Sequence, residues 1–596
     1  MRAAAVAICL IGILPAVAQE QTVGLFLNDE QAYEGYTLFG PGQGTSVYLI
    51  NNDGLVVHEW ATDYRPGLMG YLRDNGNLVR TARADGDSPI GSGGLLQEYD
   101  WDGNLVWEFE LDPQTYLAHH DIEPLPNGNL LVVAWEFKTE AEAIAAGRHP
   151  LSAGEVWPDT ILELRPIPPN DAEIVWEWHV WDHLVQQVDP TKENFGLVWE
   201  HPELVDVNFG PTSADWNHVN SVDYNAELDQ ILISVRSFNE IWVVDHSTTT
   251  EEAAGHSGGL WGRGGDLLYR WGNPWAYRLG PKRDQKLFGQ HDAQWIAPGY
   301  PGAGNILVYN NGFGRTGAGY STVDEIVPPL TETSGYSITA GHPYGPLAAS
   351  WSYMSVPRED FYSAFVSGAQ RQPNGNTLIC EGMSGHLFEV TPERGVVWDY
   401  VNPVDADGTT SQGDPPGQNI VFKIRRYPVD HPAIRDRELT PGDPVELFLA
   451  PFPVADDSLT ARLFDAGESI LVEWDATTCT SSDYNLIFGD LQQVSTQTLG
   501  GAHCAIGFDG SYAWDEVPAG SLFFMVVGTD DTGIYESSWG RDSAGVERHG
   551  TAASFLCGTT TKVISSTCEG GQGGAQPPRS VRSPNRGAIS SMEPRY

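Results

Sequence analysis

Short apolar strands that close on tryptophan or tyrosine recur along most of this chain, and each follows a tight turn. They are NNDGLVVHEW from residue 51, DWDGNLVWEFELD from 100, NDAEIVWEWHV from 170, GGDLLYRWGN from 264 and ERGVVWDYVNP from 393. A second unit, Asn-Gly-Asn before an apolar run, recurs at Asn75, Asn127 and Asn374. Tight turns between short β-branched strands indicate antiparallel hairpins. Repetition of such hairpins with uneven insertions is typical of the blades of a propeller.

The blades can be counted from these repeats. Five inner strands are visible, and a further blade can be completed from both ends of the repeat region, by SVYLINNDGLVVHEW from residue 46 and QNIVFKIRRYP from 418. We therefore predict an all-β chain with a six-bladed β-propeller over residues 19–440. The long insertion between His120 and His218 could hide another hairpin, so seven blades stay open.

The character of the sequence changes after the propeller. Short alternating strands such as SILVEWDA, DYNLIFGDL and SLFFMVVGTDD predict a small β-sandwich over 444–570, loosely like a fibronectin type III module. Four late cysteines would staple it, and the simplest of three pairings joins Cys479 to Cys504 and Cys557 to Cys568. Cys380, in an apolar run, is expected to be a buried free thiol. Residues 571–596 are rich in Gly, Pro and Ser, which predicts a disordered tail.

The first residues predict export. MRAAAVAICLIGILPAVAQEQ has one arginine, an apolar run and an Ala-Val-Ala site, as a signal peptide does, so we expect residues 1–18 to be removed. The protein would then be periplasmic or secreted. No later segment is long and apolar enough to span a bilayer. The formal net charge of −46 argues against nucleic acid as a partner, because phosphate binding needs a basic surface.

Three histidines stand at the same distance before a turn. Each precedes an Asn or Pro of that turn by seven residues: His120 before Asn127, His218 before Asn225 and His291 before Pro298. We therefore predict that they occupy one structural position on three blades. Inner-strand ends converge on one mouth of a propeller channel, so the three imidazoles would face one point. Other inner strands carry Leu68 and Ser367 there, so the fold itself does not require histidine.

Two further polar residues indicate the chemistry of this cluster. Asn220 lies two residues after His218, on the same side of an extended strand, and Arg236 lies on the following strand. Arginine, amide and imidazole together suit an oxyanion. The alternative is a three-histidine zinc site with a carboxylate from Asp121 or Asp292. A neighbouring arginine is unfavourable for a metal cation, so we predict no metal and no cofactor.

The ordered motifs HHDI…LPNGN, HVNSVDYN…ILISVRSFNEIWVVD, GQHDAQWI and QRQPNGNTLICEGMSGHLFEVT resemble the bacterial aryl-sulfate sulfotransferase family. The likeness covers roughly residues 30 to 435. It implies an exported, six-bladed enzyme that moves a sulfuryl group from an aryl sulfate to a phenolic acceptor, through a sulfated histidine and without a nucleotide donor. The cysteine pair that flanks GQHDA in some members is absent here.

Residue by residue, the resemblance assigns the nucleophile to His291. It assigns binding of the sulfuryl oxygens to His218, Asn220 and Arg236. The family's site also has a histidine on the first of these three blades, which corresponds to His120, with His119 as a weaker candidate. Two aromatic residues near these motifs, Trp216 and Phe238, are candidates to stack on the aryl ring, with packing inside the blades as the alternative role.

Other classes stay open at this stage. The chain could be a non-catalytic propeller that binds a ligand or partner, with an adhesion-type sandwich. It could also be another propeller enzyme, such as a metal-dependent lyase or a quinone-dependent dehydrogenase. Turnover of an aryl sulfate, bound metal and an absorbing cofactor would separate these hypotheses. The sequence does not decide whether the protein forms a homodimer.

Overall fold

The computed structural model describes most of the chain, namely residues 21–83, 91, 93–149, 153–331, 335–412, 414–446, 454, 458–464, 469–476, 481–515, 517–518, 520–530, 533–540 and 546–564. The predicted signal peptide, the predicted tail, Cys479 and Cys568 lie outside these residues. Contacts divide the chain into two units. The larger unit holds Val23–Thr410 and Pro415–Glu446, and the smaller one holds the described residues from 454 onward, with 21, 22, 411, 412 and 414.

The described part of the larger unit folds into six antiparallel sheets of four or five strands. The first contains β33 (Arg425–Pro428), β2 (Gly35–Phe39), β3 (Val47–Ile50) and β4 (Val56–Trp60). The second contains β5 (Pro66–Leu72), β6 (Leu78–Ala82), β7 (Leu95–Tyr99) and β8 (Leu105–Glu110). The third contains β9 (Tyr116–Pro124), β10 (Leu130–Glu136), β13 (Asp159–Ile167) and β14 (Asp171–His179).

The remaining three sheets follow in chain order. The fourth contains β17 (Val219–Asn225), β18 (Gln230–Val235), β19 (Glu240–Asp245) and β20 (Tyr269–Trp271). The fifth contains β21 (His291–Trp295), β22 (Ile306–Asn310), β23 (Thr322–Ile326) and β26 (Trp351–Tyr353). The sixth contains β27 (Gly368–Arg371), β28 (Thr377–Glu381), β29 (His386–Val390) and β30 (Val396–Val401), with β1 (Gly24–Asn28) outside β30.

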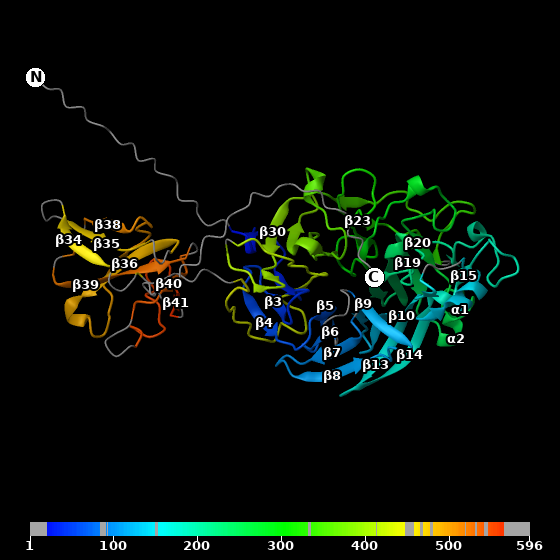
Figure 1. Ribbon diagram of the computed structural model, residues 1–596, viewed down its shortest axis with the longest axis horizontal. Helices are drawn as coiled ribbons and strands as arrows, with labels where there is room; N and C mark the ends of the chain where they lie inside the picture. The colour runs from blue at the N-terminus through cyan, green and yellow to red at the C-terminus, as the bar shows by residue number, and fades with distance from the viewer. Residues whose placement is uncertain are drawn as a thin grey trace, which may run out of the picture. The chain divides into compact units, whose positions relative to one another are not determined.

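The chain passes once around the larger unit, so its early and late strands meet. In Figure 1 the blue β3 and β4 lie beside the yellow-green β30. Tyr36 of β2 pairs with Tyr427 of β33, which confirms that both ends of the repeat region complete one sheet. Each pair of neighbouring sheets shares a hydrophobic cluster, including the sixth and the first, where Phe39 and Ile50 pack with Leu378. Packing of apolar faces is thus what holds the sheets in order.

The tryptophans of the repeat lock each sheet to the next. Each of the six lies on the fourth strand of its sheet, and its indole N–H donates at 2.7–3.0 Å to a backbone carbonyl at or before the fourth strand of the following sheet. The six bonds join Trp60 to Asp100, Trp107 to Asp171, Trp178 to Gly265, Trp271 to Pro346, Trp351 to Pro392 and Trp398 to Asn52. An indole fills the space between two sheets and still satisfies its one donor, which explains why the strands end in tryptophan.

Short elements lie in the connections of the larger unit. They are the helices α1 (Glu140–Ala145) and α2 (Thr250–Ala253), the 3-10 turns η1 (Val180–Asp182) to η6 (Gly382–Ser384), and the two-residue strands β11 (Lys138–Thr139), β12 (Glu155–Val156), β15 (Leu184–Val185), β16 (Val205–Asp206), β24 (Leu330–Thr331), β25 (Gly335–Tyr336), β31 (Val404–Asp405) and β32 (Gly408–Thr409). None of the described helices is long and apolar enough to cross a membrane. Cys380, on β28, is a buried free thiol as predicted.

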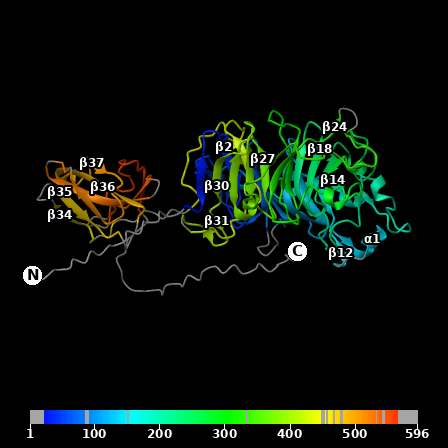
Figure 2. The ribbon, with the colours of Figure 1, turned by 90° about the horizontal axis from the view of Figure 1, so that it is seen from above.

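The smaller unit has two sheets (Figure 2), which one hydrophobic cluster joins. One contains β34 (Thr460–Phe464), β35 (Ser469–Glu473) and β38 (Ser511–Trp514). The other contains β36 (Asp483–Asp490), β37 (Gly501–His503), β39 (Leu522–Thr529), β40 (Tyr535–Ser537) and β41 (Thr561–Val563). Val472 and Trp514 of the first sheet pack with Leu486 of the second.

The disulfide of the smaller unit differs from the predicted pairing. Cys504 is bonded to Cys557, with their Cα atoms 5.4 Å apart. The predicted pairs Cys479–Cys504 and Cys557–Cys568 are therefore wrong. They were chosen for short spacing along the chain, whereas the fold brings the segment after β37 next to the one before β41.

Candidate functional site

The predicted histidines come together from three neighbouring sheets: His120 lies within β9, His218 directly precedes β17, and His291 begins β21. The ring centroids of His120 and His218 are 4.6 Å apart. The ring of Phe422 lies 6.2 Å from that of His120 and 6.3 Å from that of His291. The positive charge of Arg236 acts on both His120 and His291. We call these three histidines and Arg236 the histidine cluster.

The predicted equivalence of the three histidines holds for two of them. Neighbouring first strands are tied by a side-chain oxygen that accepts a backbone N–H of the next strand: Asp121 from Val222, Ser221 from Ala293 and Asp292 from Ala369. His120 and His291 each stand one residue before that oxygen, and on β17 this position belongs to Asn220. His218 lies two residues earlier, so its assignment to the same position is wrong.

The error comes from the turns used for the alignment. Asn225 is still paired with Gln230 in the β17–β18 ladder, whereas on the third sheet the last pair is Pro124 with Leu130 and Asn127 lies in the loop. The seven-residue count therefore starts from different points in the two hairpins. His218 still reaches the cluster, with a left-handed backbone at φ 53°.

The proton on His291 has a defined place. Its Nδ1 lies 2.8 Å from Oδ1 of Asn311 and 3.1 Å from the carbonyl of Gly289. The amide nitrogen of Asn311 donates to the carbonyls of Ser363 and Val366, which fixes the amide so that its Oδ1 is the acceptor. Nδ1 must therefore carry the proton, and Nε2 keeps its lone pair.

A backbone donor faces that lone pair. The N–H of Val366 donates to Nε2 of His291 at 3.2 Å. Val366 has a φ of 52°, a left-handed conformation that β-branched residues rarely adopt. Burial, and then the charge of Arg236, lower the pKa of His291 well below its ordinary value. His291 is thus a buried, neutral imidazole whose free nitrogen points at a hydrogen-bond donor.

His218 is paired with a carboxylate. Its Nδ1 lies 2.5 Å from Oδ2 of Asp215, whose other oxygen accepts the indole N–H of Trp135. Burial acts to raise the pKa of Asp215, but the nearby His218 lowers it below its ordinary value. An ionised Asp215 holds the proton on Nδ1 of His218 and leaves Nε2 for acid–base chemistry.

His119 lies behind His120. The two Nδ1 atoms are 2.8 Å apart, so one ring donates to the other. The ring of His119 stacks on Trp135 with centroids 3.8 Å apart, and its Nε2 lies 3.0 Å from Oδ1 of Asp159. Burial lowers the pKa of His119 to about 3, and burial followed by the charge of His218 lowers the pKa of His120 well below its ordinary value. His119 therefore orients a neutral His120 from behind.

Asn220 and Arg236 lie on the same side of the site. The buried amide of Asn220 donates to the carbonyl of Gln290, the residue before His291, at 2.8 Å. This bond uses one of the two amide hydrogens. Arg236 opens η3 (Arg236–Phe238), where its backbone N–H donates to the carbonyl of His218. Its guanidinium carbon lies 5.6 Å from the ring centre of Phe313.

A pocket of about 780 Å³ adjoins the histidine cluster, and Arg236 and Gly289 are part of its wall. Its other lining residues include four aromatic and two basic side chains, Phe209, Trp275, Phe288, Phe313, Lys282 and Arg283. Such a wall combines ring surfaces with positive charge. It suits an aromatic anion.

Trp216 and Phe238, predicted to hold the aryl ring, do not line this pocket. Both are fully buried in the core, where Phe238 packs against Phe209 and the indole of Trp216 donates to the Phe209 carbonyl. They support the wall from behind. The pocket wall therefore gives no support to direct contact of these two rings with a ligand, which stays a prediction.

The carboxylates considered for a zinc site are already paired. The ammonium of the buried Lys423 lies 2.8 Å from Oδ2 of Asp121 and 3.0 Å from Oδ1 of Asp292. Tyr71 also donates to Asp121, at 3.0 Å. Because they pair with Lys423, neither carboxylate is free to join the imidazoles in binding a metal. The positive charge of Arg236 also repels a metal cation, so the cluster is better suited to an anion.

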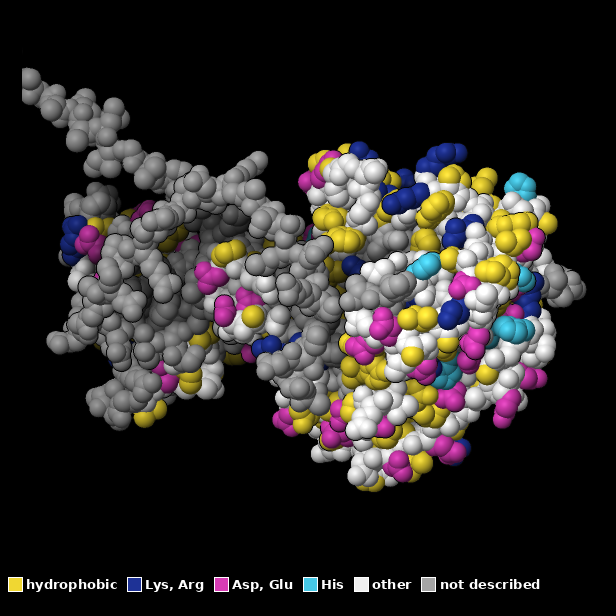
Figure 3. Space-filling view, turned by 45° about the vertical axis from the view of Figure 1, so that its right-hand side comes forward, with side chains coloured by type: hydrophobic (Ala, Val, Ile, Leu, Met, Phe, Trp, Pro, Cys, Tyr) yellow, Lys and Arg dark blue, Asp and Glu magenta, His cyan; other side chains and the backbone are white. Residues whose placement is uncertain are grey.

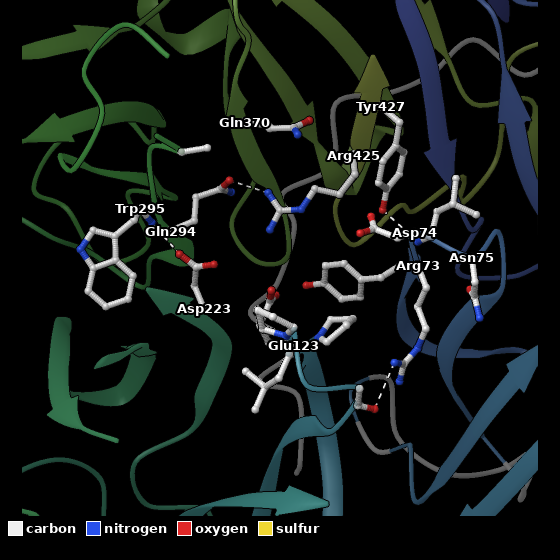
Figure 4. A pocket seen from close by; sticks show the side chains of 17 residues that line it. Arg73, Asp74, Asn75, Glu123, Asp223, Gln294, Trp295, Gln370, Arg425 and Tyr427 are labelled. Carbon is white, nitrogen blue, oxygen red and sulfur yellow. Dashed lines mark hydrogen bonds between the residues drawn. The ribbon is translucent and has the colours of Figure 1, made fainter. Parts of the chain in front are cut away.

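A second pocket, of about 600 Å³, lies at the opposite ends of β17 and β21 (Figure 4). Arg425 donates to Gln294 there at 2.5 Å, and Asp223 accepts the backbone N–H of Trp295 at 2.6 Å. Burial raises the pKa of Asp223 to about 6 and that of Glu123 well above its ordinary value. The wall of this pocket holds acidic side chains together with Arg73 and Arg425, whereas the basic side chains of the 780 Å³ pocket have no acidic neighbour among its described lining residues, which makes that pocket the better site for a sulfate ester.

The sequence did not reveal several residues of the site. Asp215 could have been found from the sequence, because it stands only three residues before His218 and is close enough along the chain to contact its ring. For Asn311 the only sequence feature was that it directly follows another asparagine, Asn310. Val366 and the pocket wall lie in connections with no repeat, so nothing in the sequence marked them.

The sequence profile of the arylsulfotransferase (ASST) family matches residues 41–425. None of the curated proteins compared matches the chain.

Solved structures resemble the chain only distantly. A protein of unknown function from Bacteroides caccae has a TM-score of 0.37 and 13% identity, covering 66% of this chain and 98% of its own. Virginiamycin B lyase from Staphylococcus aureus has a TM-score of 0.27 and 10% identity, covering 76% and 96%. The periplasmic gluconolactonase of Pseudomonas aeruginosa has a TM-score of 0.30 and 13% identity, covering 83% and 99%.

The family match is of a different kind. It spans more than half of the chain, covers the second to fifth sheets completely together with most of the sixth, and contains the histidine cluster. The chain therefore belongs to the arylsulfotransferase (ASST) family.

Proposed function

We propose that this protein is an exported aryl-sulfate sulfotransferase that transfers a sulfuryl group to a phenol through a sulfated His291. The observation that carries the proposal is the state of His291. It is buried and neutral, and Asn311 holds the proton on Nδ1, so the Nε2 lone pair faces the Val366 N–H beside Arg236. No nucleotide donor enters the scheme.

In the first half-reaction, Nε2 of His291 attacks the sulfur of the aryl sulfate. An N–S bond forms, the S–O bond to the aryl group breaks, and its electron pair leaves with the phenolate oxygen. Positive charge that develops on the ring is stabilised by the acceptors at Nδ1, the oxygens of Asn311 and Gly289. Losing one preorganised donor to a transition-state oxyanion typically costs about 100- to 1000-fold in rate.

The sulfuryl oxygens need donors as Nε2 becomes bonded to sulfur. The Val366 N–H loses its acceptor when Nε2 bonds to sulfur. It lies next to the new N–S bond, where it can donate to a sulfuryl oxygen. Arg236, which follows β18 of the fourth sheet, supplies a planar and permanently charged donor. Asn220 has a second amide hydrogen available beside Gln290.

Proton transfer falls to the pair of His218 and Asp215. Protonated His218 gives its Nε2 proton to the leaving phenolate, with Asp215 stabilising the imidazolium at Nδ1. The acceptor phenol later returns a proton to Nε2 while its oxygen attacks the sulfur. The N–S bond then breaks and its electron pair returns to His291. One site serves both halves, so the kinetics should be ping-pong.

The same proposal includes the architecture. Six sheets, the pairing of β33 with β2 and the cycle of tryptophan bonds support a six-bladed propeller. The two sheets and the disulfide of the smaller unit support a fibronectin-like sandwich. Export stays a proposal carried by the N-terminal sequence and the late cysteines.

The test is to incubate the purified protein with a fluorogenic aryl sulfate, with and without phenol. We expect release of the aryl alcohol that depends on phenol and needs no added nucleotide. With donor alone, mass spectrometry at neutral pH should find one sulfuryl group on the peptide that contains His291, and phenol should remove it. His291→Asn should abolish the label. Release that ignores the acceptor would indicate a sulfatase, and a label on His218 or His120 would refute the assignment of the nucleophile.

A further inference from the structure

Two histidines and an aspartate outside the histidine cluster meet between the third and fourth sheets. His183 follows η1 (Val180–Asp182), His256 lies in the loop after α2 (Thr250–Ala253), and Asp266 precedes β20. Nδ1 of His183 lies 2.9 Å from Oδ1 of Asp266, and Nδ1 of His256 lies 2.8 Å from the same oxygen. One ligand-type atom from each residue lies within 4.8 Å of the other two.

The surroundings of His183 fix which of its nitrogens carries a proton. Its ring is completely buried, and Nε2 lies 2.8 Å from the carbonyl of Ala253, which can only accept. Nε2 therefore carries a hydrogen, and Nδ1 is the nitrogen that faces Asp266. Histidines that bind metals commonly donate their other N–H to a carbonyl in this way.

The fold also holds this ring rigidly. Trp178 stacks on His183 at an interplanar angle of 8°, and its indole donates to the carbonyl of Gly265. A Cβ on Gly265 would lie 1.9 Å from the Ala253 oxygen and 2.5 Å from Nε2 of His183, so only glycine fits there. Nδ1 of His183 is thus held facing the same carboxylate oxygen that Nδ1 of His256 faces, and the three ligand atoms surround one position that a cation can occupy.

We propose that His183, His256 and Asp266 bind a divalent metal ion of the zinc class. Two imidazole nitrogens and one carboxylate oxygen suit zinc, whereas calcium and magnesium prefer oxygen ligands. Ligand atoms of a tetrahedral zinc site are about 3.3 Å apart, given bonds of about 2.0–2.1 Å. Each of the two nitrogens must therefore move slightly away from the Asp266 oxygen. His256 can move to allow this, because 63% of its side chain is exposed.

The position indicates a structural ion. A ferrous site with the same ligands needs open positions that face a substrate, but none of the three residues lines the 780 Å³ or the 600 Å³ pocket. The site joins the insertion after β14 to the connection between β19 and β20. Phe209 belongs to the same insertion, and Trp275 follows β20 by a few residues, and both side chains lie in the wall of the larger pocket. An ion here would clamp that wall and take no part in the chemistry.

Zinc binding by the whole protein tests the proposal. The protein, without a polyhistidine tag, is stripped with a chelator, dialysed and titrated with ZnCl₂ against a chromophoric competitor. We expect one zinc per chain, and a thermal midpoint that rises when zinc is added. His256→Ala should bind zinc at least 10-fold more weakly and lose the rise in the midpoint. Its exposed side chain makes it a safe variant, whereas replacing the buried His183 risks the fold.

The matched control is His201→Ala. His201 is also exposed and faces a single carboxylate, Nδ1 to Oε1 of Glu203 at 3.0 Å, but it has no second imidazole. It should bind zinc as the wild type does. Failure of the wild type to take up one zinc, or equal binding by wild type and His256→Ala, would show that His183 is a protonated ion-pair partner of Asp266. That result leaves the proposed function intact, because the two sites share no residue.

Discussion

At the scale of the residue, the chemistry depends on where one proton sits. An imidazole is a nucleophile only through the nitrogen without a hydrogen. Asn311 settles this for His291, because both hydrogens of its amide are committed to the carbonyls of Ser363 and Val366. The same amide holds the strained segment whose Val366 N–H faces Nε2. Asn311 is therefore a positioning residue for both partners of the reacting sulfur.

Asn311→Ala should slow turnover without removing the nucleophile. Both tautomers of His291 become accessible and the Val366 N–H is no longer held, so we expect kcat to fall about 10- to 100-fold, the usual cost of losing an orienting partner. The sulfuryl label should still form on His291, only more slowly. Asn402→Ala is the control, since Asn402 is equally buried and its amide also donates to two carbonyls, those of Val404 and Asn419, but it does not contact His291. Equal losses of kcat in the two variants would assign Asn311 a purely structural role.

Arg236 should set the pH at which His291 becomes protonated. Burial and the charge of Arg236 both lower the pKa of His291, so labelling by an aryl sulfate should persist as the pH falls below 6.5, the ordinary value. Arg236→Met removes a cation and so raises this pKa, which moves the acid limb of the labelling rate to higher pH. Arg236→Lys keeps the positive charge, so the acid limb should stay at the wild-type pH. The variant lacks the planar guanidinium that can donate two parallel hydrogen bonds, so its labelling rate should be lower. An unchanged limb in Arg236→Met would mean that another group governs it.

At the scale of the element, the tryptophan bonds explain both the repeat in the sequence and the order of the sheets. Trp398 makes the bond that joins the sixth sheet to the first, at 2.8 Å from the Asn52 carbonyl. The fourth strand of each sheet thus depends on the neighbouring sheet. The ring of sheets should therefore be weakened by the loss of any one bond.

Trp398→Phe should destabilise the larger unit by about 1–3 kcal/mol, the cost of leaving a buried polar group without its partner. The measurement is the midpoint of urea unfolding followed by circular dichroism. Trp275→Phe is the control, because that side chain is 46% exposed in the pocket wall. It should alter the KM for the donor and leave the midpoint unchanged. A Trp398→Phe midpoint equal to that of the wild type would show that packing alone closes the ring.

The sequence predicts these elements better than it predicts the site. Period-two apolar strands, Asn-Gly-Asn turns and terminal tryptophans are local signals, and they indicated the sheets and the shared sheet at the two ends of the repeat region. The position of His218 and the disulfide partner of Cys504 depend on hairpin length and on contacts between distant segments, which spacing along the chain does not report. Trp216 and Phe238 look like ligand-binding aromatics in the sequence, but burial is decided only by the packing of whole sheets.

At the scale of the whole molecule, the site has to attract an anion to a strongly acidic protein. The chain carries 33 basic and 79 acidic residues. On the face shown in Figure 3 the acidic side chains are spread among neutral ones, and basic side chains stand in small groups between them. Positive charge is concentrated locally at the pocket, where Arg236, Lys282 and Arg283 are part of the wall. Long-range repulsion and short-range attraction therefore oppose each other.

These two effects differ in their response to salt. The Debye length falls from about 30 Å at 0.01 M to about 10 Å at 0.1 M, which screens the distant acidic surface but barely affects a contact inside a buried site. We expect kcat/KM for an anionic aryl sulfate to rise several-fold over this range, while kcat/KM for an uncharged phenol stays constant. Lys282→Glu with Arg283→Glu should lower the value at low salt and steepen its rise. A wild-type kcat/KM that falls with salt would mean that the basic wall of the pocket, and not the net charge of the molecule, controls the approach of the donor.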